Sequence, residues 1–482
     1  MKSGILRHFF SVVVFAVLIL PVALAAPQTQ YRVIDMGTLG GPVSTSGQGL
    51  ALSQHKTTTN APSHGVTIGW SATANSTSPT SNPIVCGGVD GVVPYVTVSF
   101  EWFDGTFTDL GALPGGQNCS EPFWVNDKRE IVGTSENGKV DPLANVNQTR
   151  AVVWKDGKIK DLGGFGGYQN AAQAINNREQ IVGFSLNTTP DPYSLNEFFF
   201  FGSSNGTQTR AFLWDKGKMQ DLGTLGGNDA GAFGINERSQ ISGESYTSTT
   251  PNPVTGIPPV DPFFWENGTM TDIGTLGGAF GFPTFLNNNG QVIGVSSPAS
   301  DPGACLSEVD RNCHPFLWDR TSGLVDLNTG TTGGKPINAF LINDAGEIVG
   351  QADFSGSGGS AADAYYWKNY VATDLGHLQG DCYSLATSIN SAGQIVGNSF
   401  SCRGGIFHHA VLWENGSITD LNTLVPPNGP LELVAATSIN DRGEIAGNGV
   451  PPGVDPKDLA TKGHAFLLIP CGQNHLNAKD CQ

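Results

Sequence analysis

Seven polar residues share one position in a repeated sequence pattern, directly before an apolar stretch of the Ala-Phe-Leu-Trp kind. They are Arg150, Arg210, Asp261, His314, Asp363, His409 and His464. Carboxylate and imidazole groups gathered at one end of a ring of repeats could bind a ligand or, in an enzyme, catalyse its cleavage. These seven residues are therefore our candidates for a ligand face. The alternative interpretation is that each is a strand-end residue that pairs with the adjacent repeat.

Motifs that carry a catalytic mechanism are missing from the sequence. There is no Gly-x-Ser-x-Gly elbow, His-Glu-x-x-His helix, Walker loop or EF-hand loop. His408 and His409 resemble a metal-binding pair, but adjacent residues of a strand point to opposite faces. A pair of carboxylates suited to glycoside hydrolysis cannot be selected among 42 acidic residues without geometry. We therefore predict no catalytic residue, no cofactor and no metal site.

A second recurring position is an aspartate near the end of each repeat. Because it is present in every copy, we expect it to be structural, with a hydrogen bond to the backbone or to a tryptophan. The residues are Asp35, Asp109, Asp161, Asp221, Asp272, Asp326, Asp374 and Asp420.

Each repeat contains four strand-like pieces, which we call a to d. In the clearest copy, a is 231–236, b is 240–245, c is 261–265 and d is 270–274. Asn and Gly in the short a–b and c–d links supply the positive φ that hairpin turns require. Pieces b and c are apolar at successive residues, which is expected of strands that are covered on both faces.

A unit of four antiparallel strands repeated every ~50 residues is typical of a β-propeller. The last copy has pieces a, b and c but no d, whereas Tyr31–Gly37 is a piece d without a repeat of its own. We predict an all-β propeller of about eight four-stranded blades, closed by pairing of this N-terminal strand with the C-terminal blade at His464–Leu468. The first blade, Gly49–Gly111, is degenerate, with an inserted a–b link at 55–64 and an inter-blade turn at Gly40-Gly41.

The N-terminus predicts export. Lys2 and Arg7 are followed by the apolar stretch Phe9–Leu20 and by Ala23-Leu24-Ala25, a pattern typical of a signal peptide spanning 1–25. An uncleaved anchor is the alternative. Residues 26–470 then form one propeller domain and 471–482 a C-terminal tail, and no other segment is long and apolar enough to span a bilayer.

The excess of acidic residues disfavours some classes of binding partner for this chain. The formal charge of −17, from 42 acidic and 25 basic residues, lacks the basic footprint that nucleic-acid binding requires. It also disfavours anionic membrane surfaces. We expect a secreted monomer with no nucleic-acid partner.

All eight cysteines follow the N-terminal apolar segment, as expected in an oxidising compartment. Most of them fall in the predicted b–c and d–a segments, which lie on one face of a propeller. From proximity we predict three disulfides that staple these loops and a fourth that pins the tail. The pairs are Cys86–Cys119, Cys305–Cys313, Cys382–Cys402 and Cys471–Cys481.

The repeat resembles the HAF family of extracellular repeat proteins, named for a His-Ala-Phe tripeptide. That tripeptide stands at His464-Ala465-Phe466, and Asp-Leu-Gly-Thr-Leu-Gly-Gly at 221–227 and Ile-Asn-x-x-Gly-x-Ile-Val-Gly at 342–350 are also similar to the family pattern. The resemblance covers roughly residues 31 to 469. It implies extracellular placement and a β-rich repeat fold, and it brings no established reaction or catalytic residue.

The b–c loops are long and unlike one another, whereas the a–b and c–d turns are short. They span 72–97, 136–149, 186–209, 246–260, 297–313 and 352–362. Variable loops on a rigid scaffold are where binding sites are usually built. We therefore predict a binding or scaffold protein for a carbohydrate or protein ligand, with no enzymatic activity. The alternatives are a secreted polysaccharide lyase or glycosidase with its site at the loop-face mouth, and a structural surface-layer repeat.

Overall fold

The computed structural model describes residues 29–46, 65–86, 94–196, 206–305, 312–356, 362–402 and 407–472. The predicted signal peptide, the predicted insertion at 55–64 and Cys481 lie outside these ranges. No helix among the described residues reaches the length and apolarity needed to cross a membrane.

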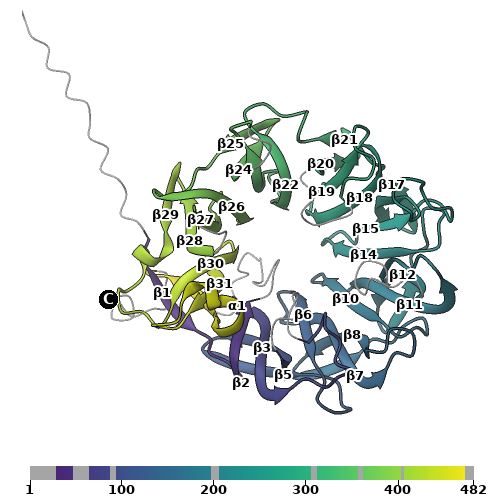
Figure 1. Ribbon diagram of the computed structural model, residues 1–482, viewed down its shortest axis with the longest axis horizontal. Coiled ribbons are helices and arrows are strands. Elements are labelled where there is room, and N and C mark those ends of the chain that lie inside the picture. The colour runs from purple at the N-terminus through teal and green to yellow at the C-terminus, as the bar shows by residue number, and fades with distance from the viewer. Residues whose placement is uncertain are drawn as a thin grey trace, which may run out of the picture.

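The described chain is an all-β propeller, in which antiparallel four-stranded units stand around a central axis (Figure 1). We call each unit a blade and keep the letters a to d for its strands, with strand a nearest the axis. The b strands pair with a and c, and c pairs with d, so each blade is a simple meander.

The first four blades in chain order are β2 to β5 (Gly40–Ser46, Thr67–Ser76, Tyr95–Phe103, Thr106–Gly111), β6 to β9 (Ser120–Val125, Ile131–Val140, Asn147–Lys155, Lys158–Asp161), β10 to β13 (Asn170–Ile175, Ile181–Asp191, Gly206–Asp215, Lys218–Asp221) and β14 to β17 (Ala230–Ile235, Ile241–Tyr246, Val260–Glu266, Thr269–Asp272). The next three are β18 to β21 (Gly277–Leu286, Val292–Pro298, His314–Asp319, Gly323–Asp326), β22 to β25 (Lys335–Ile342, Ile348–Asp353, Ala362–Lys368, Val371–Asp374) and β26 to β29 (Asp381–Ile389, Ile395–Ser401, Phe407–Glu414, Ser417–Asp420).

One pairing joins two blades. Val260 in β16 and Phe280 in β18 form a single parallel bridge, which makes β14 to β21 one continuous eight-stranded sheet. Short helical segments, at Leu421–Leu424, Pro456–Asp458 and α1 (Leu459–Lys462), are confined to connections.

The N-terminal strand completes the C-terminal blade, as the sequence predicted. β1 (Tyr31–Asp35) pairs antiparallel with β32 (His464–Pro470), whose other neighbours are β31 (Ile445–Val450) and β30 (Glu432–Ile439). Figure 1 shows the purple β1 beside the yellow strands of the chain's other end. Tyr31 is almost completely buried there, so β1 fills the position of the missing d strand.

The predicted start of the first blade was wrong. Strand a of this blade is β2, at Gly40–Ser46, whereas the sequence predicted an inter-blade turn at Gly40-Gly41 and a blade that begins at Gly49. Gly41 approaches β3 so closely that a Cβ would lie 2.6 Å from the carbonyl carbon of Ala72. Glycine is thus a close-packing residue here, and the strand lacks the Ile-Asn signature by which the other a strands were recognised.

The blades are held together internally by a glycine in strand b and an aromatic ring in strand c. A Cβ on Gly243 would lie 2.5 Å from the ring of Phe263, and one on Gly447 would lie 2.4 Å from the ring of Phe466. Both rings are fully buried. The Phe of the His-Ala-Phe tripeptide therefore packs across the Gly that ends the Ile-x-Gly pattern of strand b, which explains why the two motifs recur together.

A belt of buried asparagines surrounds the central axis at the ends of the a strands. In six of the seven, the side-chain amide donates a hydrogen bond of 3.0–3.2 Å to the main-chain carbonyl of the corresponding asparagine in the next blade. The amide of the last, Asn440, donates to Glu444. In order, the belt runs through Asn126, Asn176, Asn236, Asn287, Asn343, Asn390 and Asn440.

The same asparagine also builds its own a–b turn. The side-chain oxygen of Asn287 accepts from the main-chain N–H groups of Asn289 and Gln291, at 3.0 and 2.9 Å. Its amide also donates to the side chain of Gln291 at 2.8 Å. Glu or Gln follows each belt asparagine at this spacing, so the Ile-Asn signature records one side chain that closes a turn and joins two blades.

We predict that Asn287→Ala destabilises the protein by roughly 2–4 kcal/mol, because it leaves buried donors and a buried carbonyl without partners. Asn75→Ala removes an exposed asparagine from β3 and serves as the control, with an expected change within about 0.5 kcal/mol. Chemical denaturation followed by tryptophan fluorescence measures both. Equal stability of the two variants would show that the belt contributes nothing.

Candidate functional site

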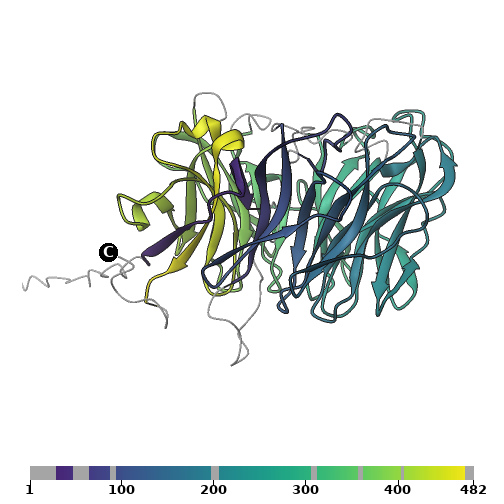
Figure 2. The same cartoon turned by 90° about the horizontal axis from the view of Figure 1, so that it is seen from below.

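The two faces of the propeller are built from different connections. The a–b and c–d links lie on one face, which we call the turn face, and the b–c and d–a links lie on the other, the loop face. Figure 2 shows the blades from the side, with α1, part of the last b–c link, at the upper, loop-face edge.

The b–c loops share a turn that the sequence analysis missed when it treated them as unlike one another. Five successive blades carry an Asx-Pro dipeptide in this loop, at Asn82, Asp141, Asp191, Asn252 and Asp301. In the first four, the Asx side chain accepts the main-chain N–H of the residue after the proline, at 2.8–3.0 Å. The recurrence of Asx-Pro once in each of these loops could have predicted the shared turn from the sequence.

Buried carboxylates anchor these loops to the next blade. Asp229 has no exposed surface and accepts from the main-chain N–H groups of Leu195 and Thr209. Burial raises the pKa of Asp229 to about 8. This effect outweighs the two hydrogen bonds, which by themselves would lower the pKa. Glu136 likewise accepts from the N–H groups of Asn82 and Cys119. The loops are therefore fastened by buried bonds.

Three predicted disulfides are confirmed: Cys86–Cys119, Cys305–Cys313 and Cys382–Cys402, with Cα–Cα distances of 5.3, 5.1 and 4.9 Å. Each ties loop-face segments together. The predicted Cys471–Cys481 pair reaches beyond the described residues and stays a prediction.

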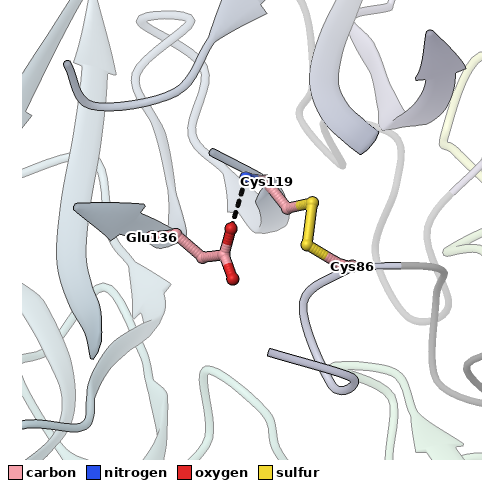
Figure 3. Close-up of side chains that lie close together, drawn as sticks. All are labelled: Cys86, Cys119 and Glu136. Carbon is pink, nitrogen blue, oxygen red and sulfur yellow. Dashed lines mark hydrogen bonds between the residues drawn. A yellow bond between two sulfur atoms is a disulfide. The ribbon is translucent and has the colours of Figure 1, made fainter. Parts of the chain in front are cut away.

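Cys86, Cys119 and Glu136 lie within 4.8 Å of one another and form the one described group with metal-like spacing (Figure 3). Both sulfurs are consumed by the disulfide, and only thiolates bind metals strongly. One carboxylate oxygen of Glu136 accepts from the N–H of Cys119 at 2.9 Å. The trio is a structural staple that links the first b–c loop to the next blade.

The seven predicted ligand-face residues come from seven different blades, and six of them form charge pairs. Four of them bind the recurrent aspartate of strand d in their own blade, at 2.9–3.0 Å, in the pairs Arg150–Asp161, Arg210–Asp221, His314–Asp326 and His464–Asp35. Asp363 instead accepts from His377 at 2.7 Å, and His409 binds Asp381 at 3.0 Å. Their participation in ligand binding stays a prediction.

The recurrent aspartate has the structural role that the sequence predicted. In every blade one carboxylate oxygen accepts the main-chain N–H two residues further on, as in Asp221 to Gly223 at 2.9 Å. In four blades the same carboxylate holds the polar residue that precedes the apolar stretch of strand c. At Asp326, burial alone would raise the pKa, but hydrogen bonds from His314 and Thr329 bring it below its usual value.

Asp261 is the exception among the seven, because its partner is also an acid. It takes the position of Arg210 but hydrogen-bonds Asp272, the strand-d aspartate. Burial, and then the charge of Asp272, raise the pKa of Asp261 to about 7. A hydrogen bond between two carboxyl groups requires a proton on one of them, so Asp261 and Asp272 share one proton.

A concave site of about 310 Å³ lies on the turn face, around the central axis. We call it the cup. Its floor contains Trp124 from β6 and Phe285 from β18, stacked with ring centroids 6.0 Å apart, together with Leu341. Above the floor the lining includes the belt asparagines, and the rim consists of the residues that follow them: Asn177, Glu237, Asn288, Asp344, Ser391 and Asp441.

The cup was not found by the sequence analysis, which placed the functional face on the opposite side. None of the seven predicted residues lines it. The available signal was the position two residues before each belt asparagine, which is small or hydroxyl-bearing in four blades but Trp124, Phe285 and Leu341 in the others.

No protein-family model matches the chain, and no curated protein matches it. Among solved structures, it is similar to the β-propeller domain of the Trilobed protease from Pyrococcus furiosus, with 10% identity, 83% of this chain and 100% of that chain covered, and a TM-score of 0.42. It is also similar to an oligogalacturonate lyase from Vibrio parahaemolyticus, with 10% identity, 78% and 94% coverage, and a TM-score of 0.41. These likenesses carry no activity over to this chain.

We predict that Asp261→Arg, which reproduces the Arg210–Asp221 pair, stabilises the protein at pH 8 and much less at pH 4. The folded-state pKa of Asp261, about 7, is above the usual value of about 3.9. The wild type therefore loses stability as pH rises from about 4 to 7. We expect a gain in thermal midpoint of roughly 1–3 °C at pH 8.

The control for this prediction is Asp215→Asn, at the end of β12 beside a c–d turn, where the ammonium group of Lys216 is 3.9 Å away. Its thermal midpoint should follow the wild type at both pH values. A gain in Asp261→Arg that is the same at pH 4 and pH 8 would contradict the shared proton.

Proposed function

We propose that this chain is a secreted binding protein without enzymatic activity: a closed, eight-bladed propeller that presents its loop face to a carbohydrate or protein ligand. Closure is supported by the β1–β32 pairing and by bonds between the first and last blades. The N–H of Ser44 donates to the carbonyl of Gly463 at 2.9 Å, and the N–H of Ser46 donates to the side chain of Asn448 at 2.8 Å. A closed ring leaves no blade face unpaired.

Ring closure predicts that a chain beginning at Thr38 does not fold. It lacks β1 and so exposes the buried face of β32 that Tyr31 and Met36 cover. We expect the shortened chain to aggregate or to lose cooperative thermal unfolding, compared with residues 26–482 under non-reducing conditions. A shortened chain with the thermal midpoint of the full one would contradict closure by this strand.

The observation that carries the binding proposal is the preformed loop face. Within the described residues, the Asx-Pro turns, buried carboxylates and disulfides hold parts of the b–c loops in place before any ligand arrives, which lowers the entropy cost of binding. At two of the turns the residue after the proline is an exposed apolar one: Leu143 is 46% exposed and Val254 is 65% exposed. Ordered apolar tips on a rigid scaffold suit a recognition surface.

Secretion is supported by the disulfides and by the predicted signal peptide, 1–25. Disulfides persist in oxidising compartments, and the pairs Cys86–Cys119 and Cys382–Cys402 join separate strands or loops. We further propose membership of the HAF repeat family, on the tripeptide His464-Ala465-Phe466, whose ring is the aromatic that packs across the strand-b glycine.

The binding proposal is tested with residues 26–482 immobilised against a panel of polysaccharides and extracellular proteins, with soluble-product release measured in parallel. We expect at least one ligand to bind without being cleaved. The double variant Leu143→Ala/Val254→Ala should weaken that binding roughly thirtyfold, since two truncated apolar contacts at about 1 kcal/mol each amount to about 2 kcal/mol.

Val371→Ala is the matched control, because Val371 is 47% exposed but is the first residue of β25, beside a c–d turn on the turn face. It should bind as the wild type does. Equal loss in the control and in the double variant would contradict the loop-face site. Release of unsaturated or reducing sugar would show that the chain is an enzyme.

A further inference from the structure

The cup lies on the face opposite the proposed loop-face surface, and nothing in that proposal uses it. Its floor is unusual for the centre of a propeller, because two aromatic rings from blades that are not neighbours meet there. Trp124 and Phe285 stack at 6.0 Å, and both remain partly exposed toward a cavity of about 310 Å³. This volume suits a small organic group.

The charged groups of the cup are all negative. Its lining includes the carboxylates of Glu237, Asp344 and Asp441, which come from alternate blades, and it includes no Lys, Arg or His. Each carboxylate accepts from a neutral donor, the main-chain N–H of Asn177, Asn288 or Ser391, at 3.0, 2.8 and 2.8 Å respectively.

Two basic residues of the adjoining turns form ion pairs away from the cup, whereas a third, Arg238, reaches its rim. Lys128 binds Glu179 and Arg442 binds Glu444, while the guanidinium of Arg238 donates to the carbonyl of Asn288. Within the described ranges, none of the three cup carboxylates forms an ion pair. Three carboxylates against the one guanidinium of Arg238 leave the rim with a net negative charge, and apolar walls focus the resulting potential into the cavity.

The carboxylates are too far apart for a bare metal ion. A Ca²⁺ ion needs six to eight oxygen ligands at about 2.3–2.6 Å, and no three described acidic groups of the cup come within 4.8 Å of one another. The negative potential is instead spread around the rim of the cup. Below this rim lie the rings of Trp124 and Phe285, whose π faces attract cations. A cation with an apolar body would contact both the floor and the rim.

We propose that the cup binds a small organic cation, an ammonium group carried on an apolar body. Stacked aromatic rings and the walls formed by Ile175, Ile235 and Ile389 receive the apolar part, and the rim carboxylates supply the charge that selects a cation over a neutral molecule of the same shape. The site is independent of the loop-face ligand, so either proposal can fail without the other.

The test compares choline with 3,3-dimethylbutan-1-ol, a neutral molecule of nearly the same shape, by calorimetry and tryptophan fluorescence on residues 26–482. We expect choline to bind at one site, at least roughly tenfold more tightly than the alcohol, and to bind more weakly as salt is raised. Equal affinity for the two probes, or no binding of either, would overturn the proposal. Binding of glucose but not choline would also overturn it.

Two variants locate the site. Glu237→Gln/Asp344→Asn/Asp441→Asn keeps acceptor oxygens for the three main-chain N–H groups but removes the charge, and it should weaken choline binding more than tenfold without affecting the alcohol. Trp124→Leu should weaken both probes. Because Trp124 also packs against three core clusters, the carboxamide variant decides the outcome if Trp124→Leu does not fold.

The matched controls are Trp214→Leu and Asp215→Asn, which alter an outer tryptophan beneath Lys160 and an exposed carboxylate. Both should bind choline as the wild type does. Equal loss in these controls would place the binding outside the cup and overturn the assignment.

Discussion

From Asn126 to Asn440, successive blades are joined at the axis by the hydrogen bond from one belt asparagine to the carbonyl of the next. At the axis the a strands come closest, and the ends of these strands would bury main-chain groups without partners if no side chain reached them. Asparagine offers two donors and an acceptor on a short side chain. It can therefore satisfy its own turn and the adjacent blade at once, which neither aspartate nor serine can do. The long-range order of the ring is thus carried by a local signature.

This arrangement separates the two faces physically. On the turn face the belt leaves little freedom, since each turn is bonded to the next and the cup is a direct product of that geometry. On the loop face the connections are longer, and they are fastened by separate means: Asx-Pro turns, disulfides and carboxylates as deeply buried as Asp229. The loop face can therefore vary in sequence without disturbing the axis, whereas a change at Asn287 affects both the turn and its neighbour.

The charged residues first considered for ligand binding are largely part of this framework. Arg150, Arg210, His314 and His464 hold the strand-d aspartate that caps the following turn. Charge pairs of this kind position strand ends, and their partial exposure limits their individual contribution to stability. Asp261 departs from the pattern, and the shared proton with Asp272 makes the stability of this blade sensitive to pH.

The sequence by itself determined the features that repeat. The period, the order of strands a to d, the missing d strand supplied by Tyr31–Asp35 and the three disulfides were all predictable, because each depends on local pattern or on proximity along the chain. Features that depend on which residues face one another across the axis were decided only by the tertiary structure. Trp124 and Phe285 occupy the same position in different repeats, and nothing in their spacing reveals that they stack. The strand at Gly40–Ser46 was missed for a related reason: its glycine is required by the close approach of β3, a contact that exists only after the chain has folded.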